Sequence, residues 1–256
     1  MPDDDASPHP DCGGLTPAER RGNADRDVAA LPWTWGSKIT DQLLRDGLRQ
    51  VEALFQGDVL DLGCGGKPYQ AIVGSSARRW IGLDRPIAAA GRPQADVFGT
   101  AMALPFRQDS FDVVLCTQVL EHVPTPLQTF KQLYQVLKPG GTLVLTTPQT
   151  NPLHEEPEDY FRFTNHGLTF LAHEVGLDVV SIEPLGGAIA TVAQMVVWHT
   201  NWVRRIPLLG PAMHAAAKAS IGWFGLKLDH LSQLYGRGAE KDTLNWLLIA
   251  RKPPPC

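Results

Sequence analysis

The chain has 256 residues, of which 43% are hydrophobic and 20% charged, and its formal net charge is −4. That length suffices for one α/β domain with an elaboration, and the acidic balance without an extended basic face argues against nucleic acid as a partner. The four cysteines are scattered without a Cys-x-x-Cys pair, so neither a zinc site nor a disulfide framework is expected. The acidic, proline-rich start differs from a secretory signal, and we expect a disordered tail over residues 1–27 and a cytoplasmic location.

Helical and strand-like segments alternate along the rest of the chain. Apolar residues at helical spacing predict helices over 38–56, 125–138 and about 165–175. Short β-type runs predict strands at 58–62, 80–84, 111–116, 142–147, 177–182 and 245–250. This alternation indicates a mainly parallel sheet covered on both faces, and ligands of such sheets bind beyond the carboxyl ends of the strands.

A glycine-rich turn follows the first predicted strand, over residues 63–68. Asp84 ends the next strand, where a carboxylate can accept hydrogen bonds from the hydroxyls of a ribose. The dinucleotide fingerprint fails because Pro68 stands at its third glycine, and the P-loop pattern fails because Lys67 is followed by Pro68. The turn therefore favours a nucleoside without a phosphate chain, and a nicotinamide-dependent dehydrogenase is disfavoured.

Several motifs in order resemble those of class I S-adenosylmethionine-dependent methyltransferases. Asp61-Leu-Gly-Cys-Gly resembles their first motif, and Asp84 resembles the acid that ends their second strand. The later matching segments are 103–106, 109–114, 119–123 and 137–144. The resemblance implies a doubly wound, Rossmann-like, mainly parallel sheet of seven strands with the last one antiparallel. It also implies S-adenosyl-L-methionine as methyl donor, S-adenosyl-L-homocysteine as product, and no metal.

The same resemblance assigns a set of cofactor-binding residues. Gly63 and Gly65 would pass beside the methionine part, Asp61 would order the loop, and Asp84 would hold the ribose. The full expected set is Asp61, Gly63, Cys64, Gly65, Asp84, Thr100, Met102, Ala103, Cys116 and Gln118. Many relatives carry an aspartate at the position of Thr100 to meet the adenine amino group. Here either Asp96 substitutes for it or the backbone alone reads the ring.

The acceptor side is less constrained, because methyl transfer is an in-line displacement that needs a general base only if the acceptor must lose a proton. We expect His122, His154 and Tyr160 to be catalytic, although His122 could instead pack or cap at a helix start. The loop over 148–163 is long and aromatic, and it resembles a stretch found in a bacterial subgroup of these enzymes. Arg162 could meet the acceptor, or it could pair with Asp159 beside a packed Tyr160. Glu121 is expected to be structural.

A long insertion separates the last two predicted strands, and we assign it to residues 184–243 of a methyltransferase domain spanning 28–256. The only charged residues from 184 to 228 are Arg204, Arg205, Lys218 and Lys227, all positive. Its polar residues and the prolines at 207 and 211 argue against a membrane span. We favour a helical cap over the active site; a peripheral membrane patch through 184–228, a homodimer surface and a plain extension of the core are the alternatives.

These observations predict methyl transfer to a small-molecule or lipid-like acceptor, at oxygen. The alternative is a non-catalytic S-adenosylmethionine-binding protein that acts as a partner or scaffold.

Overall fold

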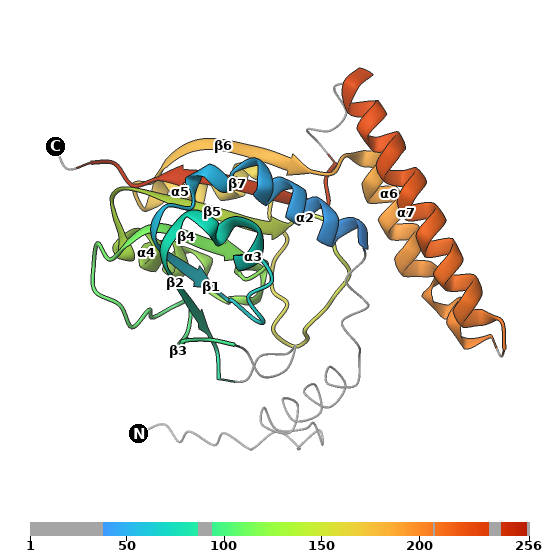
Figure 1. The fold of residues 1–256 in the computed structure, drawn as a ribbon, viewed down its shortest axis with the longest axis horizontal. Helices are drawn as coiled ribbons and strands as arrows, with labels where there is room; N and C mark the ends of the chain where they lie inside the picture. Colours follow the sequence, from blue (N-terminus) through green and yellow to red (C-terminus); the bar gives the residue numbers. More distant parts are fainter. Residues whose placement is uncertain (1–37, 87–93, 207, 236–241, 255–256) are drawn as a thin grey trace, which may run out of the picture.

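The computed structural model describes residues 38–86, 94–206, 208–235 and 242–254. Its described part contains a seven-stranded sheet in the order β3-β2-β1-β4-β5-β7-β6 (Figure 1). The strands are β1 Gly57–Leu62, β2 Ala77–Asp84, β3 Val97–Phe98, β4 Phe111–Thr117, β5 Leu137–Pro148, β6 Asp178–Leu185 and β7 Asn245–Arg251. Only β7 runs antiparallel to its neighbours among these pairings. The predicted fold class is therefore confirmed. The predicted tail over 1–27 lies outside the described residues.

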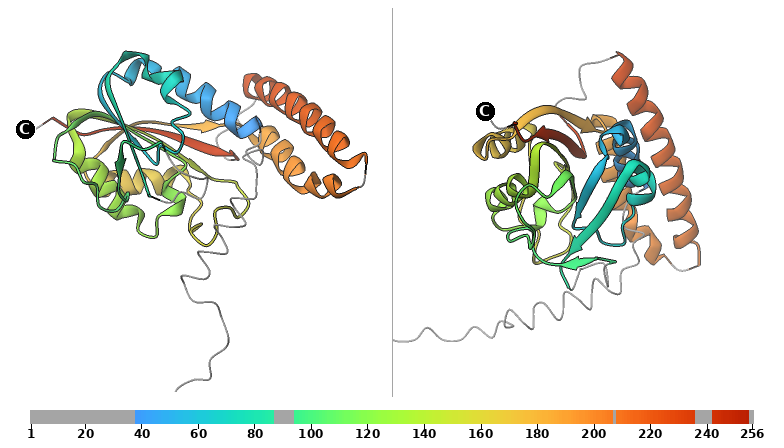
Figure 2. Two further views of the ribbon diagram at one scale, coloured as in Figure 1. Left: turned by 60° about the horizontal axis from the view of Figure 1, so that its bottom comes forward. Right: turned by 60° about the vertical axis from the view of Figure 1, so that its left-hand side comes forward.

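Helices cover both faces of the sheet, and the strand sequences explain why. Successive residues of a strand point to opposite faces, so a strand buried on both faces needs a continuous apolar run. In β1, Val59 packs into a cluster with Leu44 and Leu48 on one face. Its neighbour Leu60 packs with Phe130 on the other face. Figure 2 shows α2 and α3 on one side of the sheet and α4 and α5 on the other. Their bounds are α2 Lys38–Gln50, α3 Gln70–Val73, α4 Pro126–Val136 and α5 Asn165–Glu174.

Several predicted boundaries differ from the structure, and one strand was not predicted. The helix expected over 38–56 ends at Gln50 and is followed by a separate 3-10 turn, η2 Glu52–Leu54. The helix expected to reach 138 ends at Val136, since Leu137 already pairs with Phe111 as the first residue of β5. The edge strand β3 was not predicted, because two residues carry no period that a sequence pattern can detect.

The insertion between β6 and β7 is helical, as predicted. It contains α6 Ala188–His199, the 3-10 helix η5 Thr200–Arg205 and α7 Gly210–Tyr235. It begins after Leu185 rather than at 184, because Pro184 and Leu185 still pair with β7. We call residues 188–235 the hairpin. Figure 1 shows α6 and α7 side by side beyond the end of β6, next to α2.

The hairpin is attached to the domain through a small apolar cluster. Ile39 of α2 packs there with Ala190 and Ala193 of α6 and with Leu244, which precedes β7. None of the described helices is long and apolar enough to cross a membrane. A position of the hairpin over the active site stays a prediction.

Candidate functional site

The predicted site residues follow strands whose carboxyl ends lie side by side. Leu62 of β1 pairs with Leu83 of β2 and with Cys116 of β4, and all three strands are parallel. The residues that follow them therefore meet at one edge of the sheet, where a crevice for a ligand is expected in such folds.

The glycine turn after β1 is held against the end of β2 by main-chain bonds. The amides of Gly63 and Cys64 both donate to the carbonyl of Leu83, at 2.8 and 3.2 Å. The amide of Gly65 donates to Oδ2 of Asp84 at 2.7 Å. Thus the turn and the predicted ribose-binding carboxylate form one unit.

Glycine is required at Gly63 and leaves open space at Gly65. Gly63 has φ of 70°, and a Cβ there would lie 2.2 Å from Cγ2 of Val119, so a side chain would both strain the backbone and clash. A Cβ at Gly65 or Gly66 would meet no atom of the described residues within 4 Å. The turn thus presents bare backbone beside open space, as a closely approaching ligand requires.

Asp61 lies under this turn and is buried. Its Oδ2 accepts a hydrogen bond from Nε1 of Trp80 at 3.2 Å, whereas Oδ1 has no partner among the described residues. Burial raises the pKa of Asp61 to about 7. A buried acceptor without a partner is costly, and the cationic amine of an amino-acid ligand would both satisfy it and favour its charged form.

The segment after β3 continues the site. The amide of Gly99 donates to the carbonyl of Asp84 at 3.0 Å, which places the following residues next to the end of β2. Thr100 and Ala103 form an isolated bridge, and Thr100 Oγ1 accepts from the amide of Met102 at 3.4 Å. These contacts fix a tight turn next to the end of β2, and its contact with the adenine stays a prediction.

Asp96, one of the two alternatives for reading the adenine, is engaged by protein groups through one carboxylate oxygen. Its Oδ2 accepts from Nζ of Lys67 at 2.6 Å and from the amide of Gly82 at 2.7 Å. Although burial acts to raise it, these bonds hold the pKa of Asp96 below its usual value. Asp96 thus fastens β2 to the glycine turn, and which of the two alternatives reads the adenine stays a prediction.

The other residues expected at the cofactor are two buried cysteines and a glutamine with left-handed backbone, namely Cys64, Cys116 and Gln118. Both thiols are buried, and burial raises the pKa of Cys64 to about 12 and that of Cys116 still further, so neither is a thiolate nucleophile. Gln118 follows β4 with a φ of 54°, while its amide donates to the carbonyl of Thr146 at 2.9 Å. Left-handed backbone at a residue other than glycine is strained and gathers at functional sites.

His122 closes the short 3-10 helix η4 Leu120–His122 that follows β4. Its Nδ1 lies 2.7 Å from the carbonyl oxygen of Glu158. A carbonyl can only accept, so Nδ1 of neutral His122 carries the proton and Nε2 presents a lone pair. Burial lowers the pKa of His122, which keeps the ring neutral at cellular pH.

Two carboxyl groups face that lone pair. Nε2 of His122 lies 3.9 Å from Oε1 of Glu121 and 3.9 Å from Oε2 of Glu155. Glu121 is fully buried; its Oε2 accepts from Oγ1 of Thr147 at 3.3 Å, while Oε1 has no hydrogen-bond partner among the described residues. Burial raises the pKa of Glu121 to about 8 and also raises that of Glu155.

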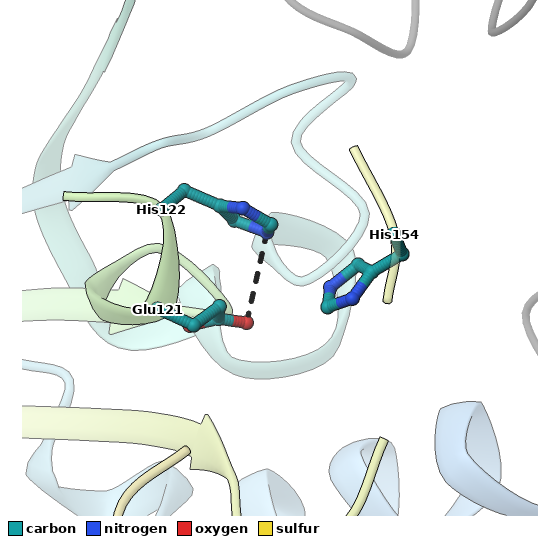
Figure 3. A group of neighbouring side chains, drawn as sticks. All are labelled: Glu121, His122 and His154. Atoms are coloured by element: carbon teal, nitrogen blue, oxygen red, sulfur yellow. Dashed lines mark ion pairs between the residues drawn. The ribbon is translucent and has the colours of Figure 1, made fainter. Parts of the chain in front are cut away.

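His154 reaches the same place from the loop after β5. Its ring lies 4.8 Å from the ring of His122, edge to face, as Figure 3 shows together with Glu121. Burial lowers its pKa, and the neighbouring His122 lowers it further. The structure therefore brings two of the three residues predicted to be catalytic into one cluster.

Arg162 has the structural role that the sequence left as its alternative. It binds both carboxylate oxygens of Asp159, at 2.6 and 2.7 Å. It also donates to the carbonyls of Asn151 and Pro152. Asp159 in turn accepts from the amide of His154 at 2.9 Å. This pair folds the loop back on itself and holds His154 in place.

Tyr160 does not belong to the histidine cluster. Its ring is 46% exposed and lies against Phe161, with 6.3 Å between the ring centroids. Its amide donates to the carbonyl of Glu121 at 2.9 Å, so its backbone anchors the loop on η4. A catalytic role for the Tyr160 hydroxyl stays a prediction.

Two contacts in this loop were not predicted. Arg85, directly after Asp84, forms an ion pair with Glu158, and Glu155 faces His122. The loop from β5 thereby reaches the end of β2. The glutamates of the loop and the arginine after Asp84 are visible in the sequence, but no motif says that they meet across the sheet.

Glu121, His122 and His154 also form a group that could hold a metal, with one ligand atom from each within 4.8 Å of the others. Histidine and carboxylate ligands bind zinc at about 2.0–2.2 Å, so ligand atoms around one ion lie roughly 3.5 Å apart. The present separations are wider than that, and the side chains would have to move inward. The absence of a metal stays a prediction.

Comparisons with known proteins agree with this geometry. The methyltransferase domain family matches residues 37–182, more than half of the chain, and the chain therefore belongs to that family. An uncharacterized methyltransferase of Mycobacterium leprae is 38% identical over 96 residues, covering 34% of this chain and 36% of that protein. The ubiquinone biosynthesis O-methyltransferase of Nitrosospira multiformis is 28% identical over 153 residues, covering 49% of this chain and 64% of that protein. The chain thus spans less than two thirds of the length of these curated relatives.

Solved structures show the same fold at low identity. A phosphoethanolamine N-methyltransferase of Haemonchus contortus, in complex with S-adenosyl-L-methionine, has a TM-score of 0.55 at 18% identity, covering 90% of this chain and 57% of that one. The cyclase SpnF has a TM-score of 0.53 at 22% identity, covering 91% of this chain and 93% of that one. Because one of these neighbours is named a cyclase, the fold alone does not determine the reaction.

Proposed function

We propose that the protein transfers the methyl group of S-adenosyl-L-methionine to a hydroxyl of a small-molecule or lipid-like acceptor, with His122 as the general base. Membership of the methyltransferase domain family supports the reaction type. The names of two relatives bear on the methylated atom: the ubiquinone biosynthesis enzymes of Nitrosospira multiformis and Pseudomonas aeruginosa are both O-methyltransferases.

The chain's own residues suit the donor. When bound, S-adenosyl-L-methionine supplies an electrophilic methyl group whose bonding electrons remain on sulfur in the product. The unpartnered Oδ1 of Asp61 can accept from the donor's amine, and the bare backbone at Gly65 admits close approach. Asp84 can accept from ribose hydroxyls, while the turn at Thr100 and Met102 borders the base.

His122 carries the chemical part of the proposal. Its Nδ1 proton is fixed by the carbonyl of Glu158, so the Nε2 lone pair faces the cluster and can take the proton that a hydroxyl loses as its oxygen attacks the methyl carbon. The base is available at neutral pH because burial lowers the pKa of His122. Once Nε2 is protonated, the carboxyl group of Glu155 that faces it can stabilise the imidazolium. Glu121, whose pKa burial raises to about 8, stays protonated at neutral pH and offers Oε1 only as an uncharged acceptor.

The loop over 148–163 supplies alignment and excludes water. Bonds to Glu121 and the pair Arg85–Glu158 fasten it across the ends of the strands. Alignment of the acceptor and removal of water are the main contributions that a protein makes to an in-line displacement.

Methyl-transfer assays with labelled donor test the proposal on acceptors that share one scaffold and carry a hydroxyl, an amine or a carboxylate. We expect methylation of the hydroxyl compound and a loss of turnover of about 10²–10⁴-fold in His122→Gln, with donor affinity unchanged. His173→Gln, at an exposed histidine of α5, is the matched control and should keep the wild-type rate.

Two outcomes would contradict the proposal. Methylation of the amine at equal rates in wild type and His122→Gln would exclude base-assisted O-methylation. Donor binding without turnover of any acceptor would favour the alternative of a non-catalytic binding protein.

A further inference from the structure

The hairpin exposes an unusual share of the molecule's large apolar side chains. Eleven of the seventeen that are exposed in the described residues belong to it. They are Val192, Met195, Val196, Ile206, Leu208, Leu209, Met213, Trp223, Phe224, Leu228 and Leu231. Exposed apolar area of this kind marks a surface that contacts another molecule or a membrane.

The two helices of the hairpin approach each other closely at one point. A Cβ on Gly225 of α7 would lie 2.5 Å from Cβ of Ala193 of α6. There is therefore no room for a side chain at Gly225. Two aromatic residues of α7 are not buried against the sheet, since Trp223 and Phe224 are each 58% exposed.

Up to residue 228, every charged residue of the hairpin is positive. The first acidic residue of the insertion is Asp229. It is buried, where its two carboxylate oxygens accept from the amides of Gly187 and Ala190 at 2.8 and 3.0 Å. It thus caps the start of α6 and adds no negative charge to the surface. Lys227 lies over the ring of the exposed Trp223, 5.9 Å from its centroid.

Cations and apolar side chains come together at the turn between α6 and α7. Arg204 and Arg205 are exposed at the end of η5. Leu208 is 99% exposed and Leu209 is 65% exposed directly after them. The amide of Gly210 donates to the carbonyl of Ile206 at 3.0 Å. Basic side chains beside apolar ones at a protruding turn suit the boundary between anionic headgroups and acyl chains.

We propose that the hairpin docks the protein on an anionic lipid surface, with Leu208 and Leu209 entering the interface and Arg204 and Arg205 contacting headgroups. A second copy of the chain matches this surface less well. In a two-fold dimer the same patch meets itself, and the cations of the patch would then face one another without carboxylates. The inference is independent of the proposed methyl transfer, since it uses none of the residues of the site.

Vesicle sedimentation with the full-length protein tests this. We expect binding to vesicles of phosphatidylcholine mixed with phosphatidylglycerol, weakened by added sodium chloride, and little binding to phosphatidylcholine alone. Arg204→Ala with Arg205→Ala should weaken binding about thirtyfold, since each basic residue near an anionic surface contributes about fivefold.

A second variant separates the apolar contribution from misfolding. Leu208 has φ of 66°, a conformation that asparagine tolerates better than leucine, so Leu208→Asn should keep the turn and still weaken vesicle binding. Arg49→Ala and Phe170→Asn, at exposed positions of α2 and α5, are the matched controls and should bind as the wild type does. Circular dichroism checks that every variant melts at the wild-type temperature.

Either of two results would overturn the proposal. One is a wild-type protein that stays in the supernatant with mixed vesicles at low salt. The other is a stable dimer in sedimentation velocity that Trp223→Ser dissociates, with vesicle binding unaffected by the changes at Arg204, Arg205 and Leu208.

Discussion

The carboxyl edge of the sheet and the hairpin violate the usual burial pattern in opposite ways. At the edge of the sheet, Oδ1 of Asp61 and Oε1 of Glu121 are buried without a hydrogen-bond partner among the described residues. On the hairpin, large apolar groups such as Trp223 and Leu208 are exposed. Each arrangement costs free energy in the isolated chain, and each would be relieved by a different kind of partner. The first suits a polar small molecule held by fixed groups, and the second suits an extended apolar surface.

The two regions also differ in how firmly they are held. The site residues are tied together by bonds between distant segments, such as Gly65 to Asp84 and His122 to Glu158. The hairpin is attached through a small cluster around Ala190 and Ala193. Substitutions in the sheet domain should therefore affect folding or cofactor affinity, and substitutions on the outer hairpin should affect neither.

A pair of phenylalanines gives the largest expected contrast. Phe130 of α4 is fully buried in the main cluster, so Phe130→Ala should lower the free energy of unfolding by about 3–5 kcal/mol. Phe224→Ala, at a side chain that is 58% exposed, should cost less than about 1 kcal/mol. Urea unfolding followed by circular dichroism measures both. Equal losses would mean that the outer face of the hairpin is buried in the folded protein.

Glu121→Gln should change how stability depends on pH. The pKa of Glu121 is raised to about 8 in the folded protein, from an ordinary value of 4.5. Its contribution is therefore fully present below pH 4.5 and is lost as the pH rises toward 8. Glutamine cannot ionise. Between pH 4.5 and pH 8, the free energy of unfolding of the variant should therefore rise by a few kcal/mol relative to that of the wild type. Unfolding curves at pH 5 and pH 8 provide the measurement, and a difference that stays constant would show that Glu121 ionises normally.

The smallest of these effects is expected at Asp84, the residue proposed to bind the ribose. Asp84→Asn keeps an oxygen for the amide of Gly65 but removes the charge, so donor affinity should fall by about 1–3 kcal/mol. Calorimetric titration measures it. Asp46→Asn, at an exposed aspartate of α2, should leave the affinity unchanged. If the two variants bind the donor equally well, Asp84 does not contact the ribose.

The sequence predicted the parts of the molecule that depend on local patterns. Apolar runs located six of the strands, and the ordered motifs placed Asp84 and the glycine turn at one edge of the sheet. The pairing of Arg85 with Glu158 could not be predicted, because it joins segments 73 residues apart through a loop without a periodic pattern. The hydrogen bond from Lys67 to Asp96 could not be predicted either, because only the fold brings these two residues together.

The hairpin was the least predictable region for a physical reason. Composition showed that 184–228 carries only positive charges, but burial of its aromatic residues depends on which helix faces touch. The close contact of Gly225 with Ala193 is one such contact, and no periodic sequence pattern predicts it. Likewise, the motif containing His122 could not reveal its tautomer, because that depends on a carbonyl of the distant Glu158.

The most direct test of the account is calorimetric titration of the full-length protein with S-adenosyl-L-methionine, S-adenosyl-L-homocysteine and NAD. The glycine turn, the unpartnered oxygen of Asp61 and the carboxylate of Asp84 predict binding of the first two ligands. Pro68 in place of a third glycine predicts no binding of NAD. Binding of NAD without binding of either adenosyl compound would contradict the account.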